Sequence, residues 1–217
     1  MPIATPIDLA TWPRRQHFEH YRSAVPCSYA MTVELDVTEF VAAVKRASRK
    51  AYIAQIWAIS AVVNRHDEFR MCLLEGGAPA LWDVIHPSFT IFNAQTETFS
   101  SVSASFDEDF AAFHDAAAAI VAEHQGSTDL FPQGPPPANA FDVSSLPGAS
   151  FTGFTLNVAN GWDHLAPIVT LGKYVVREGR TLLPLALQVH HAAVDGFHAS
   201  RLVGELQQLL SEPSWIE

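Results

Sequence analysis

Two neighbouring histidines close an apolar run near the C-terminal end of the sequence. In LPLALQVHHAAVDGFHASRL, residues 183–202, His190 and His191 follow strand-like residues, and Asp195 and Gly196 come shortly after them. Histidine can act as a general base near neutral pH when a ring nitrogen of its neutral form faces the substrate. The end of a buried strand is a rigid platform, and the AAVDG turn would return Asp195 to the same end of the sheet. The pattern predicts base catalysis at this strand end.

A purely structural explanation of the same residues competes with the catalytic one. The histidines could simply end a core strand, with Asp195 as a helix N-cap and Gly196 as a turn residue. A metal site built from His190, His191 and His198 is not favoured, because adjacent strand residues point to opposite faces and the sequence offers no second ligand cluster. We therefore predict that no metal is bound.

The composition narrows the class of protein. The chain has 217 residues, of which 48% are hydrophobic and 17% charged, and this suits one domain over residues 1–217 with some surface buried against a partner subunit. The net charge of −10 and the lack of Lys or Arg runs argue against nucleic acid as a partner. Cys27 and Cys72 are the only cysteines, and their spacing suits neither a disulfide framework nor a zinc site.

The start of the chain and its apolar runs bear on localisation. MPIATPIDLATWPRR has no basic segment followed by an apolar one, as a signal peptide would, and the longest apolar stretch, around IAQIWAISAVV, is too short for a membrane span. We expect a soluble, cytoplasmic protein without a membrane partner.

The elements that must position the histidines alternate between strands and helices. Expected strands occupy residues 27–37, 68–77, 78–93, 97–106, 150–159, 168–179 and 181–190. Expected helices occupy residues 13–23, 37–66 as a pair, 107–126 with a left-handed cap at Gly126, and 196–212. The Pro-rich residues 130–148 are expected to form a surface loop. The mixture predicts an α+β or α/β sandwich whose sheet is largely covered by helices.

QVHHAAVDGFH resembles the HHxxxDG signature of the chloramphenicol acetyltransferases, and an ordered set of further segments extends the resemblance over nearly the whole chain. These segments are WPRRQHFEHYR, DEFRM, ETFS, LFPQG, FTLNVAN and APIVTLGKY. The signature alone is shared with dihydrolipoamide acyltransferase cores and peptide-synthetase condensation domains, so the ordered set carries more weight. The resemblance implies an α+β two-layer sandwich, a large mixed sheet covered by helices, which assembles as a homotrimer with active sites between subunits.

The resemblance also implies catalytic roles. His191 would take the proton of the acceptor hydroxyl as its oxygen attacks the thioester of acetyl-CoA, the co-substrate, and would return a proton to the leaving thiolate without an acyl-enzyme. Asp195 would pair with Arg14 and fix the loop beside the base. Ser144, with Ser145 as the alternative placement, would donate to the oxyanion.

An acceptor pocket follows from the same resemblance. Thr170 would hold an ordered water near the intermediate. An apolar pocket that suits a nitrophenyl ring would be lined by Tyr21, Val25, Phe99, Phe131, Phe154, Leu156 and Ile168. Taken one at a time, each of these lining residues could equally be an ordinary core residue.

Coenzyme A is strongly anionic, so a chain of net charge −10 needs local cations where the nucleotide binds. Lys50 and Lys173 are the candidates, with Arg49 as a rival of Lys50, and Tyr174 could pack on the coenzyme. The family commonly has a tryptophan where this chain has Gly148. The missing flat contact predicts weaker binding of acetyl-CoA, or a wider tunnel for another donor or acceptor.

The sequence therefore predicts an antibiotic-resistance enzyme that acetylates chloramphenicol or a similar small hydroxyl acceptor. One alternative is an acyltransferase of the same fold for another hydroxyl or thiol, although the sequence has no lipoyl domain or Ala/Pro linker of a dihydrolipoamide enzyme. The other is a non-catalytic drug-binding protein, which would still bind its ligand after His191 is replaced.

Overall fold

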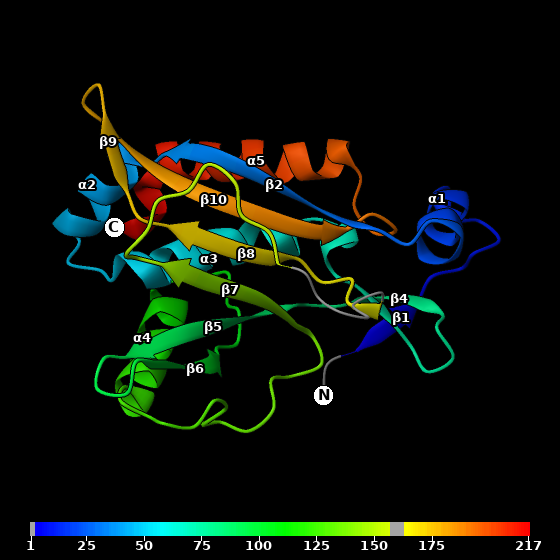
Figure 1. The fold of residues 1–217 in the computed structure, drawn as a ribbon, viewed down its shortest axis with the longest axis horizontal. Helices are drawn as coiled ribbons and strands as arrows, with labels where there is room; N and C mark the ends of the chain where they lie inside the picture. Colours follow the sequence, from blue (N-terminus) through cyan, green and yellow to red (C-terminus); the bar gives the residue numbers. More distant parts are fainter. Residues whose placement is uncertain (1–2, 157–162) are drawn as a thin grey trace.

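A computed structural model describes residues 3–156 and 163–217 and is drawn in Figure 1. Within these residues the largest element is a seven-stranded sheet in which the order β2-β10-β8-β7-β5-β6 is extended by β9 pairing with β10. Its strands are β2 (Ser28–Asp36), β5 (His86–Asn93), β6 (Thr98–Ser103), β7 (Ala140–Leu146), β8 (Ile168–Gly172), β9 (Val175–Arg177) and β10 (Arg180–His190). The pairs β5–β7 and β7–β8 are parallel and the other pairs are antiparallel, so the sheet is mixed.

Helices pack on one face of this sheet, and α3 and α4 lie behind it in Figure 1. The helices are α2 (Thr38–Arg46), α3 (Ala51–Asn64), α4 (Phe110–His124) and α5 (Gly196–Ser211), followed by a 3₁₀ turn η4 (Pro213–Ile216). Every residue of α3 from Ile53 to Val63 is buried, because this apolar helix lies against the sheet and between its neighbours α4 and α5. The predicted α+β two-layer sandwich is confirmed.

A small antiparallel sheet lies at one end of the large one, on the right of Figure 1 beside α1 (Arg15–Glu19). Its order is β1-β4-β3, from β1 (Ala4–Pro6), β3 (Met71–Leu73) and β4 (Pro79–Trp82), and the turns η1 (His20–Ala24) and η2 (Asp67–Phe69) adjoin these elements. The single strand expected over 78–93 is therefore wrong. The chain turns after Trp82, so that β4 pairs in the small sheet and β5 in the large one.

The Pro-rich segment 130–148 was expected to be a loop throughout, and this is also wrong. Its second half is β7, a strand between β5 and β8 in the large sheet. Phe141 and Val143 point into the core, whereas Asp142 and Ser144 point to the face without helices. Prolines before the strand and polar residues on one of its faces hide a central strand from pattern analysis.

Residues 151–156 form no strand, which corrects the expectation for 150–159; residues 157–159 of that expectation lie outside the described residues. The segment crosses the face without helices, and its backbone hydrogen bonds go to side chains. Phe154 N–H donates to Thr32 Oγ1 at 3.3 Å, and Leu156 N–H donates to Gln188 Oε1 at 2.8 Å. None of the helices in the described ranges combines the length and apolar character needed to cross a membrane.

Candidate active site

The C-terminal end of β10 holds the ring of His191 in a defined orientation. The ring of Tyr21 stacks on it with centroids 3.7 Å apart and planes 6° apart, and Tyr29 packs edge-on at 5.4 Å. Nδ1 of His191 is buried 3.3 Å from Asp195 Oδ1, while the side chain as a whole is 27% exposed. The carboxylate favours a proton on Nδ1, so the free lone pair of neutral His191 lies on Nε2.

Asp195 is held from two directions, because it is both the partner of Arg14 and the N-cap of a helix, as the two sequence interpretations expect. Arg14, from the other end of the chain, donates to both carboxylate oxygens, with Nη2 3.2 Å from Oδ1. Asp195 is also the N-cap of α5, and its backbone N–H donates to His198 Nδ1 at 3.0 Å. Burial raises the pKa of its carboxyl, but the ion pair with Arg14 and the nearby His198 and His191 outweigh burial, so the pKa lies below its ordinary value.

His190 faces the interior rather than a substrate. Its Nδ1 accepts a hydrogen bond from Ala192 N–H at 3.1 Å, and the ring is buried. Burial lowers its pKa, and the nearby Arg22 and His191 lower it further, so the ring is held neutral. Within residues 3–156 and 163–217, no group of His, Cys, Asp and Glu side chains is arranged to hold a metal ion.

A second polar cluster lies in the middle of the face without helices. β7 and β8 pair in parallel with Ser144 opposite Thr170, and the two hydroxyl oxygens are 3.0 Å apart. Because strand side chains alternate and Val143 is in the core, Ser145 points toward the helices and Ser144 away from them. The register therefore favours Ser144 over Ser145 as the residue available to a ligand on this face.

Within one chain, Ser144 and His191 are far apart. Thr170 pairs with Ala186 of β10, and His191 lies five residues beyond Ala186. At about 3.3 Å per residue and about 4.8 Å per strand spacing, the two side chains are separated by roughly 19 Å. A base and an oxyanion donor that act on one carbonyl must each lie about 3 Å from the reacting atoms. The two groups of one chain cannot serve the same substrate.

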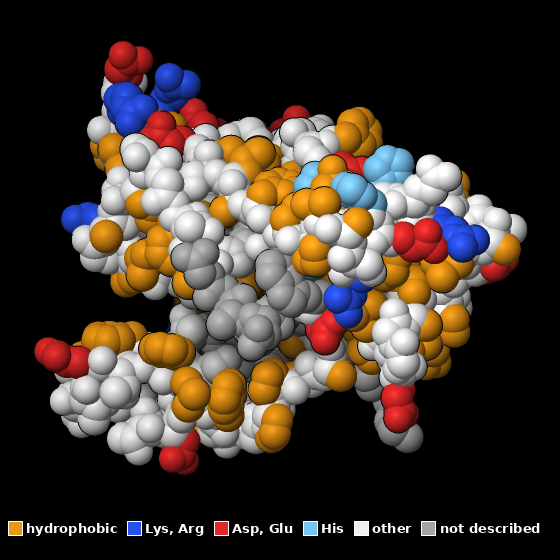
Figure 2. All heavy atoms as spheres, turned by 45° about the vertical axis from the view of Figure 1, so that its right-hand side comes forward, with side chains coloured by type: hydrophobic (Ala, Val, Ile, Leu, Met, Phe, Trp, Pro, Cys, Tyr) orange, Lys and Arg blue, Asp and Glu red, His pale blue; other side chains and the backbone are white. Residues whose placement is uncertain are grey.

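The residues assigned to the acceptor pocket lie in three places of the single chain. Tyr21 stacks on His191, and Val25 follows at the end of η1. Phe154 and Leu156 cross the open face near β2 and β10, and Ile168 is buried on β8. Phe99 lies on the edge strand β6, whose Ser101 bonds the loop that carries Phe131. The exposed fractions are 50% for Val25, 54% for Phe99, 45% for Phe131 and 41% for Leu156. Figure 2 shows hydrophobic side chains around the exposed histidines and a second group on the lower part of the molecule. One chain supplies walls rather than a closed pocket.

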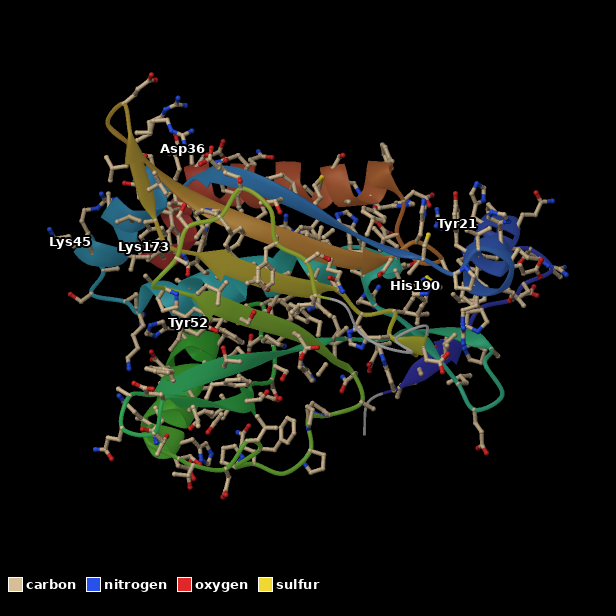
Figure 3. All side chains as sticks on the ribbon, in the orientation of Figure 1. Tyr21, Asp36, Lys45, Tyr52, Lys173 and His190 are labelled. Carbon is tan, nitrogen blue, oxygen red and sulfur yellow. The ribbon has the colours of Figure 1, made fainter. Side chains whose placement is uncertain are left out.

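The candidate coenzyme residues lie at the other end of the sheet from the histidines. Figure 3 shows Lys173 at the opposite end from Tyr21 and His190. The hydroxyl of Tyr174 accepts a hydrogen bond from Gln55 of α3 at 2.7 Å, and burial raises the pKa of Tyr174 to about 12. The tyrosine is therefore a neutral, fixed surface beside Lys173.

Lys50 and its rival Arg49 differ in how they are engaged. Lys50 is the N-cap of α3 and is exposed, whereas the guanidinium of Arg49 donates to Asp115 Oδ1 at 2.9 Å. In the described part of the chain neither Lys50 nor Lys173 is in an ion pair. The lysines are thus the better placed cations for an anionic ligand.

Gly148 has room for a larger side chain. A Cβ added there would meet no atom of the described residues within 4 Å. Gly148 itself offers no flat side chain, and no described residue lies against the position where its Cβ would be.

Sequence reasoning missed Gln188, which fixes the segment over the open face. Its Oε1 accepts hydrogen bonds from Leu156 N–H at 2.8 Å and from the Thr155 hydroxyl at 3.2 Å. The available signal was its position two residues before His190, because a polar side chain on that face of an apolar strand needs a partner.

Comparisons with known proteins agree with this architecture. The sequence profile of the chloramphenicol acetyltransferase family matches residues 3–207. A chloramphenicol acetyltransferase of Streptomyces acrimycini is 63% identical over 216 residues, which are 100% of this chain and 98% of that protein. A solved chloramphenicol acetyltransferase superposes with a TM-score of 0.87 at 22% identity and covers 96% of this chain and 100% of its own. The cubic core of the pyruvate dehydrogenase multienzyme complex superposes with a TM-score of 0.67 at 20% identity, covering 100% of this chain and 99% of its own.

The two structural matches show the fold, and the sequence matches show the family. The mixed sheet with one helix layer is the fold that this chain shares with the solved chloramphenicol acetyltransferase, and the sequence matches make the chain an acyltransferase. The chain belongs to the chloramphenicol acetyltransferase family.

Proposed function

We propose that this protein transfers the acetyl group of acetyl-CoA to a hydroxyl of chloramphenicol. The relative that is 63% identical carries the name of this activity. The observation that carries the mechanism is the orientation of His191, whose Nδ1 is buried beside Asp195 while the side chain as a whole is partly exposed. An imidazole fixed in this way can accept a proton without reorienting, as a general base requires.

The proposed reaction proceeds by direct attack with both substrates bound. Nε2 of His191 takes the proton of the acceptor hydroxyl as its oxygen bonds to the thioester carbon. The hydroxyl of Ser144 donates to the resulting oxyanion, with Thr170 beside it holding a water. The carbon–sulfur bond then breaks, and the proton passes from His191 to the thiolate of coenzyme A.

Asp195 and Arg14 serve this reaction by holding the turn that follows β10. The bidentate pair joins α1 to the start of α5 and keeps the Asp195 carboxylate beside Nδ1 of His191. Since Arg14 neutralises Asp195, we assign the pair a positioning role and no part in proton transfer.

The complete site would be formed between two copies of the chain, His191 coming from one and Ser144 from its neighbour. This follows from the roughly 19 Å between the two groups in one chain, set by strand spacings, and from the exposed apolar residues near both. Two different surfaces that meet make a head-to-tail interface, which closes into a ring. We propose that the ring is a homotrimer of single-domain chains over residues 1–217, as the family resemblance implies.

Lys50 and Lys173 would bind the phosphates of acetyl-CoA, with Tyr174 packing against the coenzyme, while the aromatic residues of the acceptor set hold the nitrophenyl ring. Acetylation of chloramphenicol in the cytoplasm would remove a hydroxyl from the drug and protect the cell. The following experiment separates this activity from its two alternatives, which are an enzyme of the same fold for another acceptor and a non-catalytic drug-binding protein.

The test is thiol release from acetyl-CoA by the purified protein, with and without chloramphenicol. We expect chloramphenicol-dependent release that falls at least about a hundredfold in His191→Ala, because a positioned general base contributes at least that much. His124→Ala, which alters a histidine at the end of α4, is the control and should release thiol like the wild type. Circular dichroism should show both variants folded.

Each of the other possible results of this experiment would overturn a different part of the proposal. Retained turnover in folded His191→Ala would overturn the assignment of the base. A wild-type protein that releases no thiol with chloramphenicol would overturn the acceptor, and binding of the drug without release would favour the non-catalytic alternative.

A further inference from the structure

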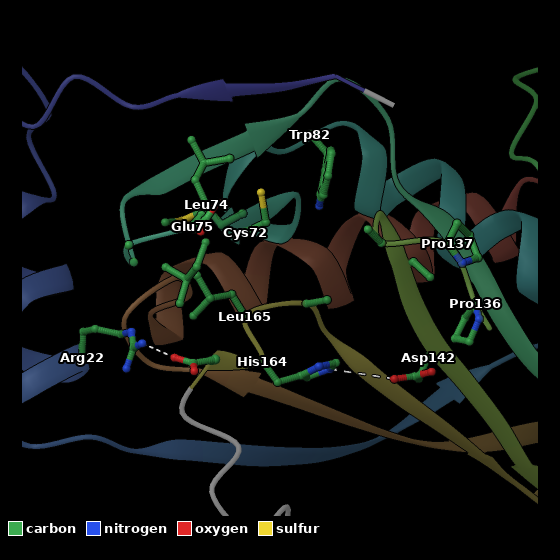
Figure 4. A pocket seen from close by; sticks show the side chains of 18 residues that line it. Arg22, Cys72, Leu74, Glu75, Trp82, Pro136, Pro137, Asp142, His164 and Leu165 are labelled. Atoms are coloured by element: carbon green, nitrogen blue, oxygen red, sulfur yellow. Dashed lines mark hydrogen bonds and ion pairs between the residues drawn. The ribbon is translucent and has the colours of Figure 1, made fainter. Parts of the chain in front are cut away.

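A cavity of about 830 Å³ lies between the small sheet, the start of β7 and the residues that precede β8 (Figure 4). Arg22 lines one side, directly after the Tyr21 that stacks on His191, and Asp142 of β7 lines another. Trp82 and Leu165 contribute apolar walls. The cavity is large enough for a small organic molecule, and none of the roles proposed above uses it.

Asp142 connects this cavity with the proposed oxyanion site. It lies two residues before Ser144 on the same face of β7, and it pairs across the parallel ladder with Ile168 as Ser144 does with Thr170. One repeat of a strand is about 6.6 Å, so a carboxylate stands that far from the Ser144 position along one continuous surface. A molecule of two or three functional groups can span this distance.

The carboxylates of the cavity differ in their partners. Asp163 is in an ion pair with Arg22, and Glu75 lies on the exposed turn between β3 and β4. Among the described residues, His164 is the only charged partner of Asp142, at 3.8 Å between Nε2 and Oδ2, and no group donates a hydrogen bond to the Asp142 side chain. Figure 4 shows Asp142 and His164 pointing toward one another at one wall of the cavity.

The surroundings of Asp142 disfavour the ionised form of its carboxyl group. Although about half of the side chain is open to the cavity, the protein around it displaces enough water to raise the pKa of the carboxyl, an effect that His164 partly offsets. A carboxylate in this position gains from a cation that donates hydrogen bonds. A protonated amine supplies both the charge and the donors.

We propose that Asp142 is a specificity-determining residue that recognises the ammonium group of hydroxyl acceptors carrying a free amine. The inference rests on the proposed acetyl transfer and extends its substrate class to amino alcohols. The ion pair with Asp142 keeps the amine protonated and without a nucleophilic lone pair, so the acetyl group goes to oxygen. The new oxygen–carbon bond replaces the carbon–sulfur bond, and the hydroxyl proton passes through His191 to the coenzyme thiolate.

The test compares chloramphenicol with its deacylated counterpart, 2-amino-1-(4-nitrophenyl)propane-1,3-diol, which has the same nitrophenyl diol but a free amine. We expect the wild-type protein to O-acetylate both. Asp142→Asn should lower kcat/KM for the amine by about tenfold or more, as loss of a charge-assisted hydrogen bond does, and kcat/KM for chloramphenicol by less than about threefold. Glu75→Gln removes the same charge from the turn of the same cavity, and we expect it to leave the ratio of the two kcat/KM values unchanged.

Several results would overturn the inference. The first is a wild-type protein that acetylates chloramphenicol but not the amine, and the second is a product that mass spectrometry shows to be acetylated on nitrogen. The third is an equal loss of kcat/KM on both acceptors in Asp142→Asn and in Asp142→Ser. The fourth is a change in the ratio of the two kcat/KM values in Glu75→Gln as large as that in Asp142→Asn. If neither acceptor is acetylated, the proposed function fails by itself. Equal affinity of wild type and Asp142→Asn for the amine in calorimetry would then overturn this inference as well.

Discussion

The histidine end of β10 and the Ser144–Thr170 face are positioned by different means. His191 is fixed by side chains from distant parts of the chain, with Tyr21 stacked on its ring and the Arg14–Asp195 pair beside it. Ser144 and Thr170 come from adjacent strands, and the register of the parallel ladder alone places their hydroxyls 3.0 Å apart. The first region depends on charge and packing, whereas the second depends on the backbone of the sheet.

Because of this difference, we expect the two regions to respond differently to changes of pH and salt. A strand register shifts only if the sheet itself changes, so the hydroxyl pair should survive changes of pH and salt. The Arg14–Asp195 pair is partly exposed, and its contribution depends on the ionisation of both groups. The two regions can therefore be disturbed one at a time.

The largest expected effect separates the two regions completely. His191→Ala chains would lack the proposed base and Ser144→Ala chains the proposed oxyanion donor, so either variant alone should have about 1% of wild-type activity or less. Coexpressed in equal amounts, they should regain about a quarter of it, because a quarter of the interfaces join an intact histidine end to an intact serine face. The control is a mixture of the two separately purified variants under conditions in which their subunits do not exchange. No recovery in coexpressed assemblies would place both groups of a site in one chain.

A smaller effect is expected at the coenzyme end of the sheet. Lys50→Ala should raise the KM for acetyl-CoA about tenfold and leave kcat within about twofold, because an ion pair with phosphate acts in binding rather than in the chemical step. Steady-state kinetics with acetyl-CoA as the varied substrate measure this change. Lys45→Ala removes an equal charge from the end of α2 and should change neither parameter. A fall in kcat alone for Lys50→Ala would contradict the assignment.

The smallest effect concerns stability and distinguishes the charged region from the hydroxyl pair. The folded state lowers the pKa of Asp195, so its carboxylate stabilises the fold above the ordinary pKa of about 3.9, and this contribution is lost as the pH falls through the lowered value. Asp195→Asn should thus lower Tm by roughly 2–6 °C at pH 7, and the gap to wild type should close only in strong acid.

Thermal melts of wild type, Asp195→Asn and Ser144→Ala from pH 7 to pH 3 would measure the contrast. The gap for Ser144→Ala should not depend on pH, since neither Ser144 nor its partner Thr170 titrates. A gap for Asp195→Asn that is equally wide at pH 3 would mean that the carboxylate adds no stability through its charge.

The sequence predicted the elements whose pattern and chemistry agree. β10 is a largely apolar run that ends at His190, directly before His191, and the Asp-Gly that follows begins α5 as expected. The Arg14–Asp195 contact, across 181 positions of sequence, was reached through family resemblance, because no periodicity relates residues so far apart. The alternation of strands and helices left the fold class open between α+β and α/β, and the family resemblance implied the α+β sandwich.

What the sequence could not predict depends on tertiary partners. β7 looks like a loop because its open face carries Asp142 and Ser144, and only the strands on either side make it central. Residues 151–156 look like a strand, yet their backbone groups bond the side chains of Thr32 and Gln188. The cavity at Asp142 joins segments from four parts of the chain, and no local pattern signals it.

The exposed aromatic pair of Phe92 on β5 and Phe99 on the edge strand β6 bears on how much enzyme a cell obtains from its gene. A newly made chain presents these rings to water until another surface covers them, and during that time aggregation competes with assembly. If the chain assembles as the proposed homotrimer, chains must meet before a site is complete, and active sites should then accumulate more than in proportion to gene dosage when expression is low. Protection of a cell would then show a threshold in transcription rather than a linear response.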